Sequence, residues 1–478
     1  MNDASSRQMT KRRRRPVPLS ASLKRGLAFG ALTAGLFVPS ALQAQEALST
    51  SGYDAPHAGN PLLPGYFADP SILRHDGKWY IYATIDPWGG DRLGVWESED
   101  FANWTFQSIN WPTKAAATSP EASDAMVWAP SVIRGRDGRF WMYISVGSEV
   151  WAGTADHPLG PWRDANKGKP LIGRNYRPGF HMIDAEAFID DDGTPYLYWG
   201  SGLNWVNGHC FVVKLNPDMV SFDGEPRDVT PGHYFEGPFM FKAGKRYFLT
   251  YSDGKTTSDT YQVRYAVGDS PLGPFTEASN NPILATDPAR QIISPGHHAI
   301  FRDRDRAYIL YHRQGLPWRE GAPLLRQVAI NRLETGPDGT LRRVTADHAS
   351  VRPGILPRER GLAYRASASG SADEIYRPSA ANDDNYATLW RAPANAGAWL
   401  QADLGRTRTL SESLIRPEFP TRRYRLRIEA SRDGRNWSTI FADFEGEGSP
   451  IRLPHRIEAR YLRLHVEGGT AIFEWAVR

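Results

Sequence analysis

The sequence contains almost no cysteine, since Cys210 is the only one among 478 residues. A chain with a single thiol forms no internal disulfide, so its stability has to come from packing. A lone cysteine can serve as a nucleophile, but a small apolar residue in a core is the simpler interpretation of Cys210. The sequence therefore excludes a disulfide-stapled scaffold.

Long apolar runs are also missing. The one candidate, residues 26–38, is shorter than the roughly 20 residues that a membrane-spanning helix needs. It follows a basic segment and precedes small residues that end at Ala44, which is the pattern of a secretory signal peptide. We therefore expect a signal peptide over residues 1–44, cleaved after Ala44, and a flexible mature N-terminus over residues 45–55. The protein is expected to be secreted or periplasmic, with no membrane span in the mature chain.

A basic excess is absent once that segment is set aside. The whole chain has a formal charge of +4, and residues 1–44 carry eight Lys and Arg and one acid, a charge of +7. The remaining residues therefore carry about −3, which removes the main support for a nucleic-acid partner. Hydrophobic residues make up 41% of the chain, enough for sizeable cores.

Helical periodicity is lacking as well, and repetition takes its place. Five similar units follow one another at steps of 60, 55, 52 and 61 residues, with first positions at Asp69, Ala129, Asp184, Glu236 and His297. Each unit has a short apolar strand, a turn that is often Asp-Gly, and an aromatic-rich strand, which is the pattern of a hairpin. All-strand repeats of this length predict a five-bladed β-propeller over residues 56–345.

The composition changes after the fifth unit. Residues 346–360 are rich in Pro and Arg and are expected to form a linker. Residues 361–478 carry new strands in which apolar residues alternate with Arg or Glu, so that one face is buried and the other is wet. A chain of about that length made of short strands favours a β-sandwich. The overall fold class is therefore all-β.

The first positions of the units should meet in the propeller, because the innermost strand of every blade runs beside the central axis. Three acids and a histidine would then share one ring, although none of the acids has a Lys or Arg beside it in the sequence. Like charges held together raise one another's pKa, so a purely structural role is disfavoured. The ring predicts a catalytic site.

Blade order separates the three acids. Blades 1 and 4 are not neighbours in a ring of five, so Asp69 and Glu236 should face each other across the cavity. Inverting glycoside hydrolysis uses two carboxyl groups roughly 6.5–9.5 Å apart, with space for a water molecule. We therefore expect Asp69 to be the general base and Glu236 the general acid. Asp184, in the adjacent blade 3, is expected to raise the pKa of Glu236.

Five motifs in this order and at this spacing resemble glycoside hydrolase family 43; they are Ala68-Asp69-Pro70-Ser71, Trp128-Ala129-Pro130-Ser131, Ile183-Asp184-Ala185-Glu186, Glu236-Gly237-Pro238 and Gly296-His297-His298. The resemblance implies the same roles for the three acids. It also implies that Trp128 lines the terminal sugar subsite and that Arg326 contacts sugar hydroxyls. The alternatives are a blade-core position for Trp128 and a strand-surface charge for Arg326.

The resemblance bears on metal binding through His297, which matches a histidine found near an axial calcium or water cluster. Calcium prefers oxygen ligands, so one histidine supports it poorly, and we expect no required cofactor and at most a structural Ca²⁺. The acidic run 190–193 could suggest calcium too, but it lacks the distal glutamate of an EF-hand and is expected to be a hairpin turn.

Residues 361–478 resemble the coagulation factor 5/8 type C, or discoidin-like, modules. The similarity rests on segments 381–385, 388–390, 399–405, 431–437 and 459–463. It implies a carbohydrate-binding module, although Trp390, Trp399 and Trp437 fit a core better than a ligand platform.

The leading hypothesis is an inverting exo-hydrolase that removes arabinofuranose or xylose from plant-type polysaccharides or oligosaccharides; the sugars come from the resemblance alone. Another furanosidase, a β-galactosidase or an endo-arabinanase of the same fold stays open, as does a non-catalytic carbohydrate-binding propeller. Insertions 86–91 and 203–207 are expected to rim the pocket, with Trp88 and Trp205 as sugar platforms. We expect the protein to act as a monomer.

Overall fold

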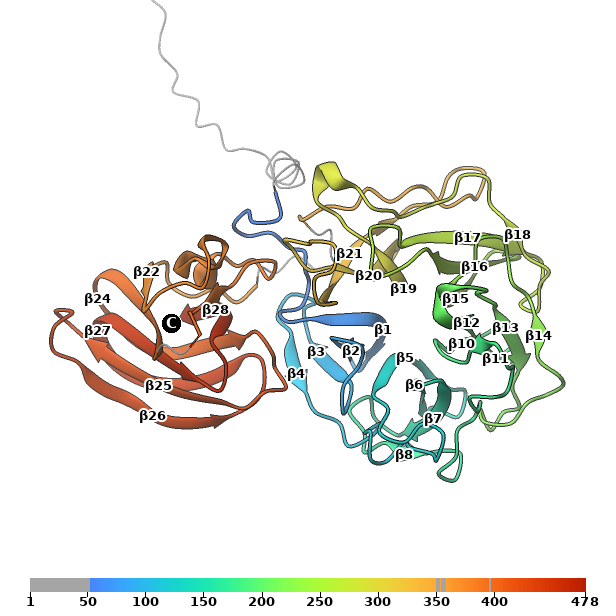
Figure 1. The fold of residues 1–478 in the computed structure, drawn as a ribbon, viewed down its shortest axis with the longest axis horizontal. Helices are drawn as coiled ribbons and strands as arrows, with labels where there is room; N and C mark the ends of the chain where they lie inside the picture. The colour runs from blue at the N-terminus through green and yellow to red at the C-terminus, as the bar shows by residue number, and fades with distance from the viewer. Residues whose placement is uncertain (1–51, 350–352, 354–357, 395–396) are drawn as a thin grey trace, which may run out of the picture.

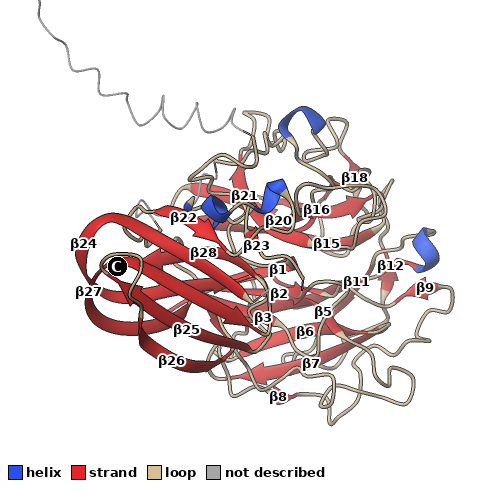
Figure 2. Cartoon of the chain, turned by 60° about the vertical axis from the view of Figure 1, so that its left-hand side comes forward, coloured by secondary structure: helices blue, strands red, loops and turns tan. Residues whose placement is uncertain are grey.

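The computed structural model describes residues 52–349, 353, 358–394 and 397–478, which form two β-rich parts (Figure 1). The expected signal peptide and segments 350–352 and 354–357 of the expected linker lie outside the described residues. Within the described part the only helices are short 3₁₀ turns, and no helix there is long and apolar enough to cross a membrane. The all-β prediction is confirmed (Figure 2).

The first part is a five-bladed propeller made of antiparallel sheets (Figure 1). Blade 1 consists of β1 (Phe67–His75), β2 (Lys78–Ile85), β3 (Gly94–Ser98) and β4 (Thr105–Gln107), and blade 2 of β5 (Val127–Arg134), β6 (Phe140–Val146), β7 (Glu149–Ala155) and β8 (Arg163–Asp164). Blade 3 consists of β10 (Glu186–Ile189), β11 (Pro195–Trp199), β13 (Phe211–Lys214) and β14 (Arg227–Asp228), and blade 4 of β15 (Glu236–Ala243), β16 (Arg246–Asp253), β17 (Gln262–Gly268) and β18 (Thr276–Glu277). Blade 5 consists of β19 (Gly296–Asp303), β20 (Arg306–Gln314) and β21 (Arg326–Leu333). A short ribbon of β9 (Phe180–His181) and β12 (Ser201–Gly202) belongs to blade 3.

The hairpin turns have the backbone that the sequence predicts. Asp76 and Gly77, between β1 and β2, have φ angles of 47° and 82°. Such left-handed angles suit the right-handed twist of the paired strands, and asparagine, aspartate and glycine adopt them most readily. The acidic run forms the corresponding turn of blade 3, where the Gly193 N–H donates to the Asp190 carbonyl at 2.7 Å. The turn prediction for residues 190–193 is confirmed.

Neighbouring blades are joined near the axis by one repeated hydrogen bond. A backbone N–H at the start of one blade donates to a side chain on the second strand of the blade before it. The pairs are Ala129 to Thr84 Oγ1 at 2.8 Å, Asp184 to Ser145 Oγ at 3.0 Å, His297 to Ser252 Oγ at 2.9 Å and Asp69 to His312 Nδ1 at 3.3 Å. The last pair joins blade 5 to blade 1. The bond therefore fixes the inner strands, and the residues they carry, at four of the five blade junctions.

The N-terminal segment closes the propeller at its seam, the junction between blades 5 and 1. Blade 5 has three named strands, and residues 60–62 run beside its outer strand β21. Leu62 N–H donates to the Val328 carbonyl at 2.8 Å, and the Asn60 side chain accepts from Ile330 N–H at 3.0 Å and donates to its carbonyl at 2.9 Å. The Leu62 side chain is fully buried. A segment from before blade 1 thus covers the edge of blade 5.

The second part is a β-sandwich of the discoidin type, as expected from the alternating strands. Its strands are β22 (Arg365–Ala368), β23 (Trp390–Arg391), β24 (Ala398–Pro417), β25 (Tyr424–Ser431), β26 (Ser438–Gly446), β27 (Ile451–Glu467) and β28 (Ala471–Val477). Trp390 lies in its core with no exposed surface, whereas Trp399 and Trp437 are half-buried. The core assignment therefore holds for the first of these tryptophans and not for the other two.

One arginine fastens the sandwich to the seam of the propeller. Arg358 is 4% exposed and donates to the carbonyls of Ala58, Gly59 and Pro61 at 3.2, 2.8 and 3.0 Å. It also donates to the Asp384 carbonyl at 3.1 Å. Hydrogen bonds to a buried charge are stronger than neutral ones, so Arg358 stabilises the closure segment and the junction together.

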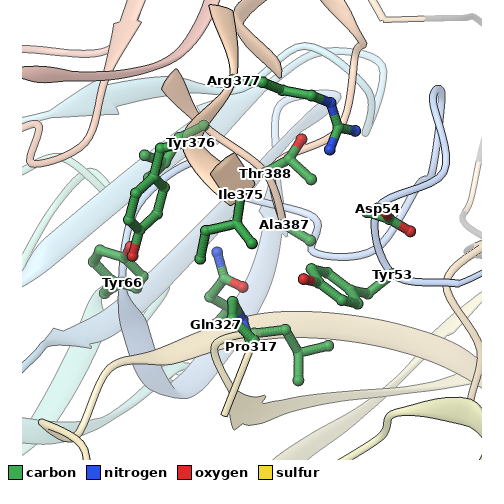
Figure 3. A pocket seen from close by; sticks show the side chains of 12 residues that line it. Tyr53, Asp54, Tyr66, Pro317, Gln327, Ile375, Tyr376, Arg377, Ala387 and Thr388 are labelled. Atoms are coloured by element: carbon green, nitrogen blue, oxygen red, sulfur yellow. The ribbon is translucent and has the colours of Figure 1, made fainter. Parts of the chain in front are cut away.

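The N-terminal residues take part in this junction. Asn385 Nδ2 donates to the Tyr53 carbonyl at 2.7 Å and to the Ala55 carbonyl at 3.0 Å, so the end of the segment expected to be flexible contacts the sandwich. A small cavity between the parts is lined by the N-terminal segment, the propeller and the sandwich, which contribute for example Tyr53, Gln327 and Tyr376 (Figure 3).

We predict that Arg358→Ala lowers the free energy of unfolding by about 2–4 kcal/mol, because four carbonyls, three of them buried, lose a charged donor. Urea unfolding followed by tryptophan fluorescence measures this change. The matched control is Arg360→Ala, which removes an ion pair to Asp384 whose arginine side chain is 49% exposed, and which should cost less than about 1 kcal/mol. Equal costs for the two variants would contradict a special role for Arg358.

Candidate active site

A pocket of about 310 Å³ lies on the propeller axis, because residues from all five blades line it. All eight site residues expected from the sequence are among them: Asp69, Trp88, Trp128, Asp184, Trp205, Glu236, His297 and Arg326. The fold therefore brings together in one cavity side chains that are spread over more than half of the chain.

The ring that holds the acids has a strained backbone. Asp69, Ala129, Asp184 and His297 have φ angles of 50°, 45°, 60° and 36°, in the left-handed region that side chains other than glycine rarely adopt. Strand pairing skips at three of these positions, where β-bulges interrupt β1, β5 and β19. Bulges redirect side chains and are common beside active sites. The strain is thus concentrated on the residues that face the axis.

Glu236 does not occupy the ring position that the repeat alignment gives it. In blade 4 the left-handed residue is Gly237, with φ of 59°, and Glu236 stands one residue earlier. It pairs with Ser252, as Trp128 pairs with Ser145 in blade 2. The alignment is therefore wrong by one residue here. The physical reason is His297: a Cβ at Gly237 would lie 3.2 Å from its ring, so blade 4 places a glycine in the ring and its acid beside it.

Asp69 is a buried carboxylate held by hydroxyl and cationic donors. Thr84 Oγ1 donates to its Oδ2 at 2.6 Å, and Arg326 Nη1 donates to its Oδ1 at 3.1 Å. His297 Nδ1 lies 3.2 Å from the same Oδ1. Burial alone would raise the pKa of Asp69, but the charges of Arg326 and His297 outweigh it and hold this pKa well below its usual range. The surroundings of Asp69 therefore favour its ionised form.

Arg326 is the cationic partner that the sequence did not suggest for the ring acids. It is 4% exposed, so a strand-surface charge is excluded. Its Nε and Nη2 donate to Asp86 Oδ2 and Oδ1 at 3.0 and 2.7 Å, and its backbone N–H donates to Oδ2 at 2.6 Å. Asp86 thus fixes the guanidinium against Asp69. Sequence analysis missed Asp86, whose only signal was its place at the start of a rim insertion.

His297 lies between two carboxylates. Its Nδ1 is 3.2 Å from Asp69 Oδ1 and 3.7 Å from Asp184 Oδ2. Burial would lower the pKa of His297, but the two carboxylates raise it to about 9. Burial is also the main cause that raises the pKa of Asp184 to about 8; His297 opposes it, and Glu236 and Asp69 add to it. The imidazolium therefore faces an ionised Asp69 and an Asp184 whose raised pKa favours its neutral form at neutral pH.

Glu236 is held at both oxygens by hydroxyl groups. Tyr261 Oη lies 2.7 Å from its Oε1 and Ser201 Oγ 2.8 Å from its Oε2. Burial is the leading cause that raises the pKa of Glu236, the Asp69 charge adds to it, and the two hydroxyls and His297 oppose it. The sequence had attributed this rise to Asp184, and the two acids do interact, since the Glu236 charge raises the pKa of Asp184. Neither hydroxyl residue was predicted, because no motif marks them.

Tyr261 can reach Glu236 because blade 5 leaves space for it. A Cβ on Gly296 would lie 2.2 Å from the Tyr261 ring, so glycine is required there. The tyrosine ring also stacks on His312, with centroids 5.5 Å apart and planes 1° apart. A motif glycine of the sequence, Gly296, thus has a structural explanation.

Aromatic side chains form the walls of the pocket. Trp128 is half-buried, donates from Nε1 to the Gly147 carbonyl at 3.1 Å and faces His181 at 6.0 Å, so it is not a blade-core residue. Trp205 stacks on Phe235 at 5.8 Å. Such flat apolar surfaces suit the C–H faces of sugar rings.

The surroundings of His297 bear on the expected structural calcium. No group of three or more His, Cys, Asp or Glu that could hold a metal ion occurs in the described part of the chain. The His297 nitrogen that faces the acids is engaged by Asp69 and Asp184 instead. We therefore derive no step through an axial calcium.

The geometry combines an ionised acid with one whose raised pKa favours its protonated form. Two carboxyl groups with pKa values driven apart by their surroundings can act as base and acid in one reaction. The site thus fits general acid–base chemistry.

Comparison with known proteins agrees with the structure for both the propeller and the sandwich. Residues 58–341 match Glycosyl hydrolases family 43, and residues 365–477 match the F5/8 type C domain. A beta-D-galactofuranosidase of Aspergillus niger is 34% identical over 274 residues, which cover 54% of this chain and 76% of the relative. An arabinoxylan arabinofuranohydrolase of Bacillus subtilis is 30% identical over 351 residues, 63% of this chain and 67% of the relative.

Solved structures extend the similarity to the two-part arrangement. One glycoside hydrolase superposes with a TM-score of 0.75 at 28% identity and covers 90% of this chain and 100% of its own. A thermostable family-43 glycoside hydrolase superposes with a TM-score of 0.50 at 28% identity over 62% of this chain and 96% of its own.

Proposed function

Because the chain belongs to glycosyl hydrolases family 43, and so hydrolyses O-glycosyl bonds with inversion, we propose that it removes terminal α-L-arabinofuranosyl or β-xylosyl units from plant-type polysaccharides and oligosaccharides. The observation that carries the proposal is the pairing of an ionised Asp69 with a Glu236 of raised pKa in one pocket. The alternative of a non-catalytic propeller would not need this pair.

In the proposed mechanism Asp69 accepts a proton from water, and the oxygen attacks the anomeric carbon. Glu236 donates its proton to the leaving oxygen on the opposite face, as an inverting reaction requires. Arg326 and His297 keep Asp69 ionised, and Asp86 and Asp184 hold these two cations in place. After the reaction Asp69 is protonated and Glu236 is ionised, and exchange with solvent restores both. No cofactor is required, and EDTA should leave the rate unchanged.

The pH dependence follows from these ionisations. Activity needs ionised Asp69, whose pKa is lowered, so it persists as the pH falls below the ordinary range of aspartate. It also needs protonated Glu236, so it is lost as the pH rises through a pKa raised above the usual 4.5. Tyr261→Phe removes a hydroxyl that stabilises the carboxylate and should move this alkaline limb to higher pH.

A pH profile of kcat/KM checks this shift. Tyr265→Phe is the matched control, because its hydroxyl contacts Asn280 outside the pocket and its loss should not move the limb. An alkaline limb that moves to lower pH in Tyr261→Phe would contradict the assignment of Glu236 as the acid.

The sugar is the part of the proposal that the relatives support by name. An arabinofuranohydrolase and xylosidase/arabinosidases are among them, and the galactofuranosidase, at 34% identity, makes β-D-galactofuranosides the second candidate. Hydrolysis of aryl arabinofuranoside, xyloside and galactofuranoside substrates, with the product anomer followed by NMR, tests the choice. Release of only galactofuranose would overturn the first candidate, and no hydrolysis of any of the three would overturn both.

We propose in addition that residues 1–44 direct secretion to the periplasm or medium and that the mature protein is a monomer without a nucleic-acid partner. N-terminal sequencing should then begin at Gln45, and light scattering should give the mass of one chain.

For residues 361–478 we propose carbohydrate binding. Trp399 and Trp437 flank the Arg463 guanidinium at 4.6 and 4.1 Å, and Trp437→Ala should reduce retention on insoluble xylan.

A further inference from the structure

The exposed apolar side chains of the described residues gather around the pocket. Four large ones are exposed: Trp88 at 42%, Met126 at 41%, Leu203 at 38% and Val206 at 55%. Trp88 and Leu203 line the pocket itself, and Val206 follows Trp205, which also lines it. Met126 adjoins the Trp88 loop, since a Cβ on Gly89 would lie 2.9 Å from its Cβ. We call these four residues and Trp205 the apolar collar. Exposed apolar side chains gathered beside a pocket mark a place of contact.

The two tryptophans of the apolar collar have a strained backbone. Trp88 and Trp205 have φ angles of 59° and 64°, which are exceptional for bulky residues. They come from blades 1 and 3 and meet edge to face, with ring centroids 6.2 Å apart. Strain of this kind persists only where the surrounding structure enforces it, and it collects at sites of function. The surrounding structure therefore holds the two indole rings in place at the pocket mouth.

The 203–206 side of the collar is tied to the proposed acid. The loop follows Ser201, whose hydroxyl lies 2.8 Å from Glu236 Oε2. Its Trp205 stacks at 10° on Phe235, the residue before Glu236. Gly202 permits this fold, because a Cβ there would lie 2.5 Å from the Phe235 ring. The 203–206 loop is thus anchored beside the group that protonates the leaving oxygen.

We infer that the apolar collar is the subsite for the leaving group, and that it takes a pyranose ring of the polysaccharide backbone whose apolar C–H faces lie against Trp88 and Trp205. The inference rests on the proposed function, because it assumes that Glu236 protonates the glycosidic oxygen. The charged side chains Asp69, Asp184 and Arg326 of the pocket are at most 5% exposed, whereas four of the five collar side chains are exposed by 38% or more. The rim offers apolar surface instead, which favours a ring held by its faces over one held by hydroxyl contacts.

The experiment compares two leaving groups on the same terminal sugar. One substrate carries that sugar on a xylo-oligosaccharide, and the other carries it on a methyl group, which has no ring faces. Trp205→Ala and Trp88→Ala should each lower the ratio of kcat/KM for the oligosaccharide to kcat/KM for the methyl glycoside by about tenfold or more. Val206→Ser, at an exposed position, should lower it to a smaller extent.

Trp128→Ala is the matched control, since it alters the deep wall of the pocket. It should reduce both kcat/KM values and keep their ratio within about threefold. A ratio that stays unchanged in both collar variants would overturn the inference, as would a loss confined to the methyl glycoside. Circular dichroism of each variant verifies that the fold is retained.

A binding measurement separates failure of this inference from failure of the proposed function. Xylotriose, which mimics the leaving chain, is titrated calorimetrically into the wild-type protein and the two collar variants. Binding to wild type that is lost in the variants supports the collar even if wild type hydrolyses no glycoside. Absence of binding to wild type overturns the collar even if hydrolysis is observed.

Discussion

Asp69→Asn should lower kcat by about 10³–10⁴-fold, because an amide cannot take the proton of the attacking water. The substitution keeps the shape of the side chain, and its Oδ atom can still accept from Thr84, so the pocket should persist. The loss should be equal for natural and aryl glycosides, since both need the same water. Steady-state kinetics on the two substrate classes measures it.

The control for this variant is Asp76→Asn in the adjoining hairpin, where the side chain is 82% exposed. It should retain full activity. An Asp69→Asn enzyme with more than about a tenth of the wild-type kcat would show that another group activates the water.

The loss of activity in Glu236→Gln should depend on the leaving group of the substrate. On natural glycosides we expect a loss of about 10³-fold, because the sugar oxygen needs a proton to depart. On a dinitrophenyl glycoside, whose leaving group departs as an anion, the loss should stay within about tenfold. The amide keeps both hydroxyl contacts, so Ser201 and Tyr261 should still position the side chain.

Glu99→Gln provides the control, because that side chain is 79% exposed on blade 1. Both substrate classes should be unaffected by it. Losses of the same size on natural and dinitrophenyl glycosides in Glu236→Gln would assign this residue a role other than the acid.

The blades could be predicted from the sequence because their signals are local. A turn such as Asp76-Gly77 and the strands beside it lie within about 20 residues, so pattern alone identifies them. The position of Glu236 could not be fixed as well, because Glu-Gly-Pro can be aligned on its acid or on its glycine. The contact between Gly237 and His297, from different blades, decides between the two.

The residues that set the pKa values of Asp69 and Glu236 could not be predicted from local sequence patterns. Arg326 lies 257 residues from Asp69 and 240 from Asp86. The family resemblance named Arg326 as a sugar contact, but no local pattern pairs it with either acid. Ser201 and Tyr261 hold Glu236 through single hydroxyl groups, which carry no pattern either. The acids were predictable as a set, whereas the causes of their pKa values were not.

The junction was unpredictable for a different reason. Three of the carbonyls that Arg358 binds belong to residues 58–61, and a backbone acceptor has the same chemistry whatever the side chain. The core role of Trp390 was foreseen because an apolar residue in an alternating strand has few other places to go.

The seam near Asn60 has a consequence for how the protein is made and cut. The segment that seals blade 5 leaves the ribosome first, but the arginine that locks it is synthesised almost 300 residues later. The hydrogen bonds from Arg358 to the closure segment therefore cannot form until the linker has been synthesised. A chain truncated at residue 345 to isolate the propeller would keep every catalytic side chain and lose these hydrogen bonds, and its ring would open first between blades 5 and 1.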